Sequence, residues 1–471
     1  MDRVGFAPVM RAWRRQVASL SVAACAVGFA VAASPAGADW NCGAPLQPAC
    51  PPSAPANPDG SLPVASPLAP LPAPVRGTPL FARISGRLPS GFNVWVGRGS
   101  LSTKERGAVL GAFGGTLARF PVNWAYTQAR PGGPYDWRAS DGLYSTYVAA
   151  GVRPILEVVA SPNWAVSDLS ACDFYLDRGV QSQQECDIGP DPSRIGAYDA
   201  FALAVARRYP LAAAIEIWNE PNYEGYWKGR DPSAYATLAA SATSAIKAGA
   251  PAMRVLVGAL ANATDDGPRW TAMATFVSAL RDSGVLTIAD GLSFHPYPGT
   301  LTEFGFTGAF AALQETLPAG SDIRLVASEL GASEKTFTAA QQRDILVKEY
   351  RELDAADPAV PWSSSVDAVV FDTDIDPSHN FGFVDRTLLG TLAPRPVFCA
   401  MASILGGSGM CGQSPLIATA RKARLHRRQR RAPRRHPRRY RAMTIAVHAL
   451  SRNVPDTPVR RSTWAIADDG G

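Results

Sequence analysis

Short apolar runs recur along the central part of the chain, and helix-like segments separate them. Eight runs of six to eight residues have the character of buried strands. The segments between them, such as "DAFALAVARRY" and "SAYATLAASATSAIKA", are rich in alanine and have helical periodicity. The pattern therefore predicts an α/β fold with strands over residues 91–96, 115–122, 153–160, 213–218, 254–260, 291–297, 323–329 and 366–372.

Eight strands that alternate with helices favour one architecture, a (β/α)8 TIM barrel that forms a single catalytic domain. The repeating part spans residues 81–412, a natural length for a barrel with insertions. An open doubly wound sheet is the alternative. It is disfavoured because no glycine-rich turn follows the first strand and because polar residues end many strands, not two neighbouring ones. Functional side chains are therefore expected at the carboxyl ends of the strands.

The segments that flank the predicted barrel have compositions that do not build a core. Residues 1–38 run from basic to apolar to "SPAGA", the order of a secretory signal peptide, with an uncleaved membrane anchor as the alternative. Residues 39–80 are rich in Pro, Ala and Ser and predict an extended linker. Residues 413–471 form an Arg-rich tail. A disordered tail, a reading-frame artefact and a contact with anionic polymers or lipids are the three interpretations of it.

Charge is distributed unevenly along the chain. The formal net charge is +6 at pH 7, but residues 421–441 alone hold eleven Arg and one Lys with no acidic residue. The rest of the chain is therefore net acidic, and a nucleic-acid-binding fold is not indicated.

The cysteines agree with export from the cytoplasm. Beyond residue 38 six remain, and they form three couples that are close in sequence. Neighbour pairing is the simplest of the 15 connectivities that six cysteines allow, and disulfides fit an oxidising compartment. A metal site is the weaker interpretation, because no CxxC spacing occurs and the histidines do not cluster near the cysteines. The couples are Cys42 with Cys50, Cys172 with Cys186, and Cys399 with Cys411.

One carboxylate interrupts the apolar pattern at the end of the fourth strand. In "AAAIEIWNEPNYEGYW", Glu220 stands directly before Pro221, which marks the exit of the strand. Strand alternation predicts that Glu216, Trp218 and Glu220 share the inner face. A solvated loop glutamate is the simpler interpretation of Glu220, but its aromatic and amide neighbours favour a sugar site, because aromatic rings stack on sugars and amides bind hydroxyls.

A second carboxylate stands at the equivalent position of the seventh strand. "IRLVASELGAS" is an apolar run that ends at Glu329. In a barrel, the ends of the fourth and seventh strands face each other across the mouth. Two carboxyl groups about 5 to 5.5 Å apart are what a retaining glycosidase requires, one as the acid and one as the nucleophile.

These motifs resemble the clan A (β/α)8 retaining glycoside hydrolases, especially family 39 and family 5, over the whole of the predicted barrel. "WNEPN" (residues 218–222) is the most specific element, and the resemblance makes Glu220 the acid/base and Glu329 the nucleophile. "FHPYP" (294–298) matches the pattern of the sixth strand and "LARFPVNW" (117–124) that of the second. "FGFVD" followed by "APRPVF" resembles the closing stretch of the family.

The resemblance implies roles for further residues. Tyr297 orients the nucleophile, and His295 holds a sugar hydroxyl or steadies the acid/base, with a structural histidine as the alternative. Asn219 holds the sugar 2-hydroxyl. Arg119 pairs with the nucleophile or, alternatively, with Glu216, which is interpreted as structural.

Two departures from the family leave the floor of the sugar site open. "EVVASPNWA" offers Asn163 and Trp164 where family 5 carries a histidine, and "VVFDTDID" lacks the tryptophan of the eighth strand. Phe371 or Asp374 occupies that neighbourhood. Trp124 and Trp164 are candidate sugar platforms, with core packing as the alternative for each.

Together these observations predict a secreted, monomeric β-glycosidase that acts on oligo- or polysaccharides without a metal or an organic cofactor. Association with the cell surface is an additional expectation. A non-catalytic, secreted carbohydrate-binding barrel is the alternative.

Overall fold

The structure is a computed structural model of the whole chain. It describes residues 55–94, 101–177, 180–263, 266–298, 313, 315–317, 320–355, 365–375, 381–387 and 390–411. The predicted signal segment, the Arg-rich tail and the couple Cys42 with Cys50 lie outside the described residues.

Eight parallel strands close into a barrel, in the spatial order β1, β11, β10, β9, β8, β7, β3, β2 and back to β1. Every one of the eight apolar runs overlaps one of these strands, so the predicted fold is confirmed. The strands are β1 (Ser90–Asn93), β2 (Leu117–Asn123), β3 (Arg153–Val159), β7 (Ala214–Ile217), β8 (Val255–Ala261), β9 (Gly291–His295), β10 (Arg324–Leu330) and β11 (Val366–Asp372).

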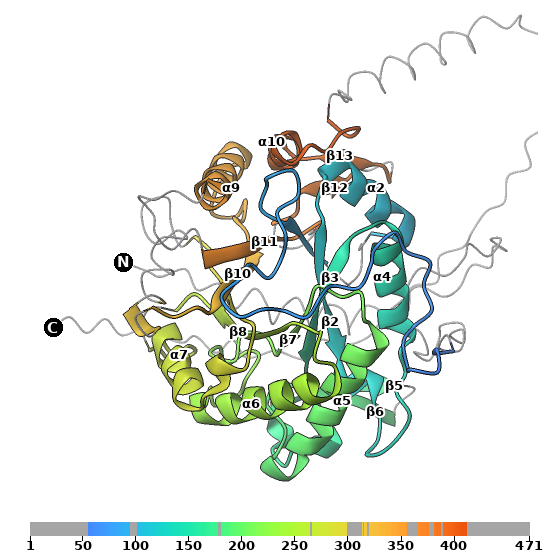
Figure 1. Cartoon of the computed structure of the whole chain (residues 1–471), viewed down its shortest axis with the longest axis vertical. Helices are drawn as coiled ribbons and strands as arrows, with labels where there is room; N and C mark the ends of the chain where they lie inside the picture. The colour runs from blue at the N-terminus through green and yellow to red at the C-terminus, as the bar shows by residue number, and fades with distance from the viewer. Residues whose placement is uncertain are drawn as a thin grey trace, which may run out of the picture. The chain divides into compact units, whose positions relative to one another are not determined.

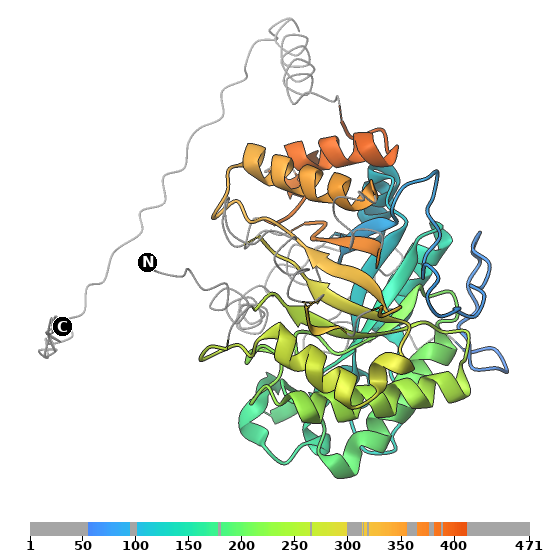
Figure 2. The ribbon, with the colours of Figure 1, turned by 60° about the vertical axis from the view of Figure 1, so that its left-hand side comes forward.

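Helices surround the barrel (Figure 1), and the view turned by 60° shows them on the outside again (Figure 2). Their sequences explain where several of them begin. Ser102 with Glu105, and Thr338 with Gln341, form capping boxes, and the Asp231 carboxylate accepts from backbone N–H groups of the first turn. The helices are α2 (Thr103–Phe113), α3 (Trp124–Thr127), α4 (Arg138–Ala149), α5 (Ile195–Arg208), α6 (Pro232–Gly249), α7 (Met273–Asp282), α9 (Ala339–Asp354) and α10 (Pro396–Leu405).

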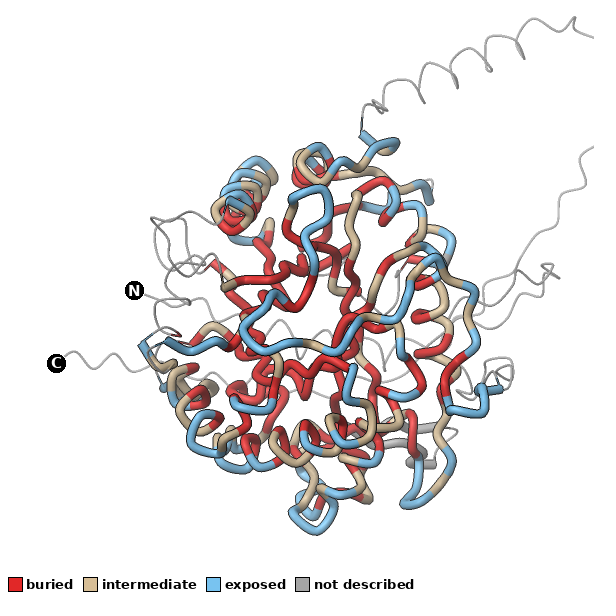
Figure 3. Tube along the Cα trace, in the orientation of Figure 1, coloured by how far each residue is buried: buried red, intermediate tan, exposed pale blue. Residues whose placement is uncertain are grey.

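Most of the buried apolar residues belong to two clusters, which strand alternation places outside and inside the strands. Buried positions lie along the barrel strands and on parts of the surrounding helices (Figure 3). The outer layer fills the space between strands and helices. The inner layer closes the amino-terminal end of the barrel with side chains such as Leu117, Ile155 and Leu256. Leu80 and Phe81, which precede the first strand, belong to the same inner layer. The interior above it, toward the carboxyl ends of the strands, is polar.

The described part of the predicted linker, residues 55–80, contains no helix or strand, but it contacts the barrel at several points. The Leu62 N–H donates to the Arg208 carbonyl (2.9 Å), and the Ser66 hydroxyl donates to the Val148 carbonyl (2.7 Å). The Leu80 N–H donates to Asp367 Oδ2 (2.6 Å). This segment therefore packs against the barrel and places Leu80 in the apolar layer at its amino-terminal end.

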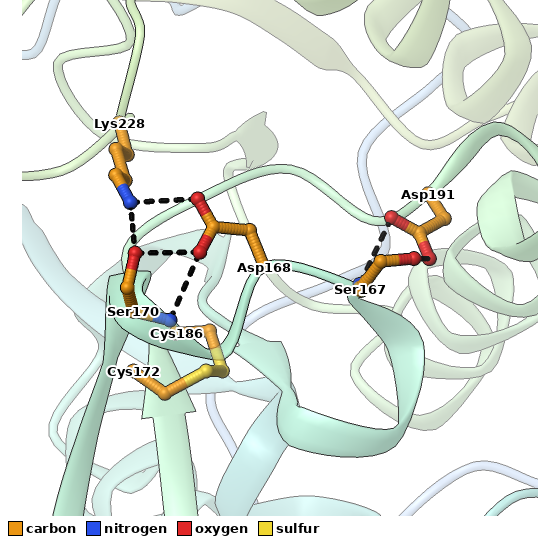
Figure 4. Close-up of a disulfide and its surroundings, with 7 residues drawn as sticks. All are labelled: Ser167, Asp168, Ser170, Cys172, Cys186, Asp191 and Lys228. Atoms are coloured by element: carbon orange, nitrogen blue, oxygen red, sulfur yellow. Dashed lines mark hydrogen bonds and ion pairs between the residues drawn. A yellow bond between two sulfur atoms is a disulfide. The ribbon is translucent and has the colours of Figure 1, made fainter.

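A small antiparallel sheet follows β3 and consists of β4 (Ser161–Pro162), β5 (Cys172–Asp177) and β6 (Val180–Cys186). The disulfide Cys172–Cys186 closes it (Figure 4). Beside the disulfide, Lys228 contacts Asp168 (2.6 Å) and Ser170, which ties the sheet to the loop after β7.

A second disulfide, Cys399–Cys411, lies at the end of the described chain. Two of the three predicted neighbour pairings are thus confirmed. In the described part of the chain, none of the helices combines the length and the apolar character that a membrane crossing needs. Residues 381–411 also contain the two-stranded sheet β12 (Val384–Arg386) and β13 (Leu392–Pro394).

We expect that Leu80→Ala lowers the free energy of unfolding by about 2 to 5 kcal/mol, because it opens a cavity in the closed end of the barrel. Leu80 is 4% exposed, whereas Val75 in the same segment is 66% exposed. Urea unfolding followed by circular dichroism measures the change. Val75→Ala is the control and should change stability by less than about 0.5 kcal/mol. Equal, small effects of both substitutions would contradict a structural role for this segment.

Candidate active site

Two glutamates lie at the carboxyl ends of strands on opposite sides of the barrel mouth. Glu220 is the third residue after the end of β7, and Glu329 is the second-last residue of β10. Both are nearly buried, with exposed fractions of 6% and 4%. The nearest ligand atoms of Glu220, Glu329 and His295 all lie within 4.8 Å of one another. The sequence-predicted pair is therefore brought together.

Glu329 reaches the interior because β10 is irregular. Val326 belongs to the inner apolar layer, so strict alternation would point Ser328 and Leu330 inward. The register against β11 shifts between Ala327 and Leu330, and Leu330 packs into the outer layer instead. This bulge turns the Glu329 side chain into the barrel.

The predicted common face of Glu216, Trp218 and Glu220 is wrong for Trp218. The strand ends at Ile217, and the backbone takes positive φ angles at Trp218 (70°) and Glu220 (41°). The Trp218 indole is fully buried in the outer layer, where its Nε1 donates to the Tyr226 carbonyl (3.0 Å). Alternation of faces holds only while the backbone stays extended, and here it ends before Trp218.

Left-handed backbone recurs at the mouth of the barrel. Ala160 after β3 and Ala259 in β8 also have positive φ, 67° and 44°. Such conformations cost about 1 to 3 kcal/mol each in a residue with a Cβ and persist where the surrounding structure enforces them. Backbone hydrogen bonds do so here: the Trp218 N–H donates to the Val158 carbonyl (3.0 Å) and the Glu220 N–H to the Ala259 carbonyl (2.9 Å).

Arg119 is the centre of the polar interior and is 1% exposed. Its Nε donates to Glu216 Oε2 (2.6 Å), its Nη1 to Glu329 Oε1 (2.6 Å) and its Nη2 to Asn219 Oδ1 (2.8 Å). The same Nη1 lies 3.3 Å from Glu157 Oε2. The two partners that the sequence offered as alternatives, the nucleophile candidate and Glu216, are both present. Glu157, in the middle of β3, was not singled out from the sequence.

Tyr297 and Asn93 hold the other side of Glu329. The Tyr297 hydroxyl donates to Glu329 Oε2 (2.7 Å) and also contacts Asp372 Oδ2 (2.9 Å). Asn93 Nδ2 donates to Glu329 Oε1 (3.2 Å) and to Asp372 Oδ1 (3.3 Å). Sequence analysis named Phe371 and Asp374 near this place but missed Asp372 and Asn93. The signal that would have found them is their position as the last residues of β11 and β1.

His295 is paired with the other glutamate. Its Nδ1 lies 3.0 Å from Glu220 Oε1 and 3.6 Å from Glu329 Oε2, and its side chain is fully buried. The charge environment of the two glutamates is therefore unequal. A guanidinium contacts Glu329, whereas an imidazole contacts Glu220.

Burial raises the pKa of both glutamates, and different neighbours act on the pKa of each. At Glu220 the negative charge of Glu329 adds to the rise, while His295 opposes it. At Glu329, Arg119 and Tyr297 oppose the effect of burial. Burial lowers the pKa of His295, so that its imidazole is neutral near pH 7, and raises the pKa of Tyr297 well above its usual value. The contacts of Glu329 with Arg119 and Tyr297 thus favour its charged form, in opposition to burial and to the charge of Glu216.

Among the described residues, Glu220, His295 and Glu329 also form a group that could ligate a metal ion. The contacts of Glu329 disfavour that use, because Oε1 already accepts from a guanidinium at 2.6 Å, and a cation placed beside it would be repelled. The arrangement suits proton transfer and nucleophilic attack better.

The two candidate sugar platforms pack with the outer apolar layer. Trp124 is fully buried, and its Nε1 donates to Gln128 Oε1 (2.8 Å). Trp164 is half-buried, meets Trp124 edge-on at 5.2 Å between ring centroids, and donates to the Gln128 carbonyl (3.0 Å). A fully buried ring presents no face to a sugar, so Trp124 takes the core-packing alternative.

The protein is a closed parallel barrel with two carboxyl groups, in different charge environments, at the carboxyl ends of its strands. Comparison with solved structures finds the same fold in glycoside hydrolases. One is a family 39 glycoside hydrolase from Bacteroides cellulosilyticus, with a TM-score of 0.50 and 18% identity over 69% of this chain. Another is a monomeric β-xylosidase from Caulobacter crescentus, with a TM-score of 0.50 and 20% identity over 71% of this chain.

The match does not extend over the full length of these structures. It covers 65% of the first chain and 69% of the second. No protein-family model matches the sequence, and no curated protein matches it.

We expect that Arg119→Met lowers the free energy of unfolding by about 3 to 5 kcal/mol at pH 7, because it leaves buried carboxylates without their counter-charge. Despite burial, Arg119 holds the pKa of Glu216 below its usual value of 4.5. The stability that this pair contributes is present above pH 4.5 and is lost as the pH falls through the lowered pKa. The deficit of the variant should therefore shrink toward acid pH.

Urea unfolding of both proteins between pH 3 and pH 8 measures this difference. Arg343→Met is the control, because Arg343 forms an exposed pair with Asp344 and should matter little at any pH. A deficit that does not depend on pH would show that Arg119 contributes through packing alone.

Proposed function

We propose that this protein is a secreted, retaining β-glycosidase with Glu220 as acid/base and Glu329 as nucleophile. The carrying observation is the separation of the two carboxyl groups, whose nearest oxygens lie within 4.8 Å. Retaining enzymes hold their carboxyl groups about 5 to 5.5 Å apart, whereas inverting enzymes need about 6.5 to 9.5 Å to admit a water molecule. The two solved structures of the same fold are described as a family 39 glycoside hydrolase and a β-xylosidase, which supports the same class of reaction.

In the first step Glu329 attacks the anomeric carbon while Glu220 gives its proton to the departing oxygen. The contacts support this division of roles. Arg119 and Tyr297 stabilise a negative charge on Glu329, whereas burial and the charge of Glu329 raise the pKa of Glu220, which favours its protonated form. The bond from the anomeric carbon to the leaving oxygen breaks as the glycosyl ester forms.

In the second step Glu220 acts as a base. The ester on Glu329 carries no charge, so the contribution of Glu329 to the pKa of Glu220 disappears. Glu220 then accepts a proton from water, which attacks the anomeric carbon and releases the sugar with its original configuration.

The remaining predicted residues support this chemistry. Arg119 fixes the orientation of the Asn219 amide, because its guanidinium donates to Oδ1 (2.8 Å). Nδ2 of Asn219 is then the group that donates to the sugar 2-hydroxyl. His295 orients the Glu220 carboxyl group through Nδ1.

The environment of the protein is part of the proposal. Two disulfides fit an oxidising compartment outside the cytoplasm. We propose a carbohydrate as the substrate and a monomer as the functional unit. The contact of the Arg-rich tail with anionic surfaces stays a prediction.

The first test is hydrolysis of a panel of aryl β-xylosides, glucosides, galactosides and mannosides, together with soluble polysaccharides. Glu329→Gln should reduce turnover by 10⁴-fold or more in order of magnitude, because the nucleophile is lost. Glu220→Ala should still form the glycosyl enzyme from a substrate with an activated leaving group, and azide should then restore its turnover more than that of Glu329→Gln.

Undiminished turnover in both variants would refute the assignment. Binding of glycans without release across the whole panel would favour a non-catalytic carbohydrate-binding barrel.

The pH dependence provides a separate prediction. The alkaline limb of kcat/KM reports the loss of the Glu220 proton in the free enzyme. His295 opposes the raised pKa of Glu220, so in His295→Ala we expect the alkaline limb to move to higher pH. A pH profile of the aryl glycoside reaction measures the shift. A limb that stays in place or moves to lower pH would contradict the proposed contact.

A further inference from the structure

The side chain of Asn222 ties the loop that carries Glu220 to the neighbouring strand β8. The Asn222 amide is fully buried. Its Nδ2 donates to the Ala261 carbonyl (2.9 Å) and to the Thr271 carbonyl (3.2 Å), and its Oδ1 accepts from the Ala261 N–H (2.8 Å). One side chain therefore joins the loop just after Glu220 to the last residue of β8 and to the segment beyond that strand.

The strand residue that Asn222 holds lies beside the partner of Glu220. Ala261 and His295 are opposite each other in the register of β8 and β9. His295 contacts Glu220 Oε1 through Nδ1 (3.0 Å). The contacts therefore close into a ring: the loop of Glu220 is bound to β8, β8 is paired with β9, and β9 carries the imidazole that meets the Glu220 carboxyl group.

The backbone conformation at Glu220 depends on such support. Its φ angle of 41° is left-handed, a conformation that a residue with a Cβ keeps only where the surrounding structure enforces it. The Glu220 N–H donates to the Ala259 carbonyl of β8 (2.9 Å), and the Glu220 carbonyl accepts from the Tyr223 N–H (2.9 Å). Asn222 adds a side-chain attachment to the same strand two residues further along the loop.

The chemistry of an amide matches this position. The Asn222 side chain presents two N–H donors and one oxygen acceptor on a short stem, and it meets two carbonyls and one N–H. Alanine supplies none of these groups, and buried hydrogen bonds that are left unmade are costly. Loss of the amide would therefore loosen the loop from β8 next to the proposed acid/base.

We propose that Asn222 is a positioning residue for the acid/base, which holds the Glu220 carboxyl group where it can give a proton to the departing oxygen. The inference rests on the proposed glycosidase function and deepens it. A displacement of about 1 Å in a reacting group can cost about 100-fold in rate. Proton donation matters most for a strongly basic leaving group, so the position of Glu220 matters most with such substrates.

Two aryl β-glycosides of one sugar accepted in the substrate panel test this inference on the full chain. A dinitrophenyl group departs without a proton, whereas an unsubstituted phenyl group needs one. In Asn222→Ala we expect kcat/KM for the phenyl glycoside to fall about 100-fold and kcat/KM for the dinitrophenyl glycoside to fall far less. The ratio of the dinitrophenyl value to the phenyl value should therefore rise about tenfold or more.

The ratio separates positioning from a loss of structure, because a smaller fraction of folded protein lowers both rates equally. Leu80→Ala, at the amino-terminal end of the barrel, is the control for lost stability and should leave the ratio unchanged. Thermal unfolding establishes that each variant is folded, and Asn222→Ser takes the place of Asn222→Ala if the latter is not.

A double variant tests whether Asn222 acts through Glu220. Glu220→Ala alone should raise the ratio, because the proton donor is gone. Adding Asn222→Ala to Glu220→Ala should raise the ratio no further, since no carboxyl group is left to position.

Two results would overturn the inference while the proposed function stands. One is an unchanged ratio in Asn222→Ala, which would limit Asn222 to a structural role. The other is a further rise of the ratio in the double variant, which would show that Asn222 acts independently of Glu220. Hydrolysis of no glycoside by the wild-type protein would instead refute the proposed function itself.

Discussion

A single buried guanidinium organises the interior of this barrel. Arg119 has almost no contact with solvent and forms ion pairs with carboxylates from three other strands: Glu157 of β3, Glu216 of β7 and Glu329 of β10. A charge removed from water is tolerated only when partners surround it, and a partner removed leaves an uncompensated charge behind. The polar layer is therefore a unit that lies above an apolar floor.

The unequal treatment of the two glutamates follows from that unit. Arg119 donates hydrogen bonds to Glu216 and Glu329. Among the described hydrogen bonds, the side-chain partner of Glu220 is His295 and not Arg119. A guanidinium therefore contacts one carboxylate and an imidazole the other, although both stand at strand ends in similar sequence surroundings. The backbone that carries Glu220 after β7 takes positive φ angles at Trp218 and Glu220. Asp372 shares the Tyr297 hydroxyl with Glu329.

Much of this architecture can be predicted from the sequence, and each residue that was misplaced or missed has a specific physical cause. All eight strands are recognisable because parallel strands are buried on both faces and become short apolar runs between helices. Trp218 was assigned to the inner face because alternation was continued beyond the last extended residue. Asn93 and Asp372 were missed because each is an ordinary polar residue at a strand end, and they become neighbours only when β1 pairs with β11 and closes the barrel. Trp124 resembles a sugar platform until Trp164, Tyr198 and Phe201 enclose it.

The sequence by itself determined the fold class, the two carboxylates at the ends of the fourth and seventh strands, and two disulfide pairings, because each depends on local pattern or short separation along the chain. Tertiary structure alone decided which carboxylate meets a cation. It also decided that Glu329 points inward through a bulge and that Asp372 shares a tyrosine with it. Coulomb energies and hydrogen bonds depend on distances between atoms. Barrel closure sets those distances between residues that lie more than two hundred positions apart, such as Arg119 and Glu329.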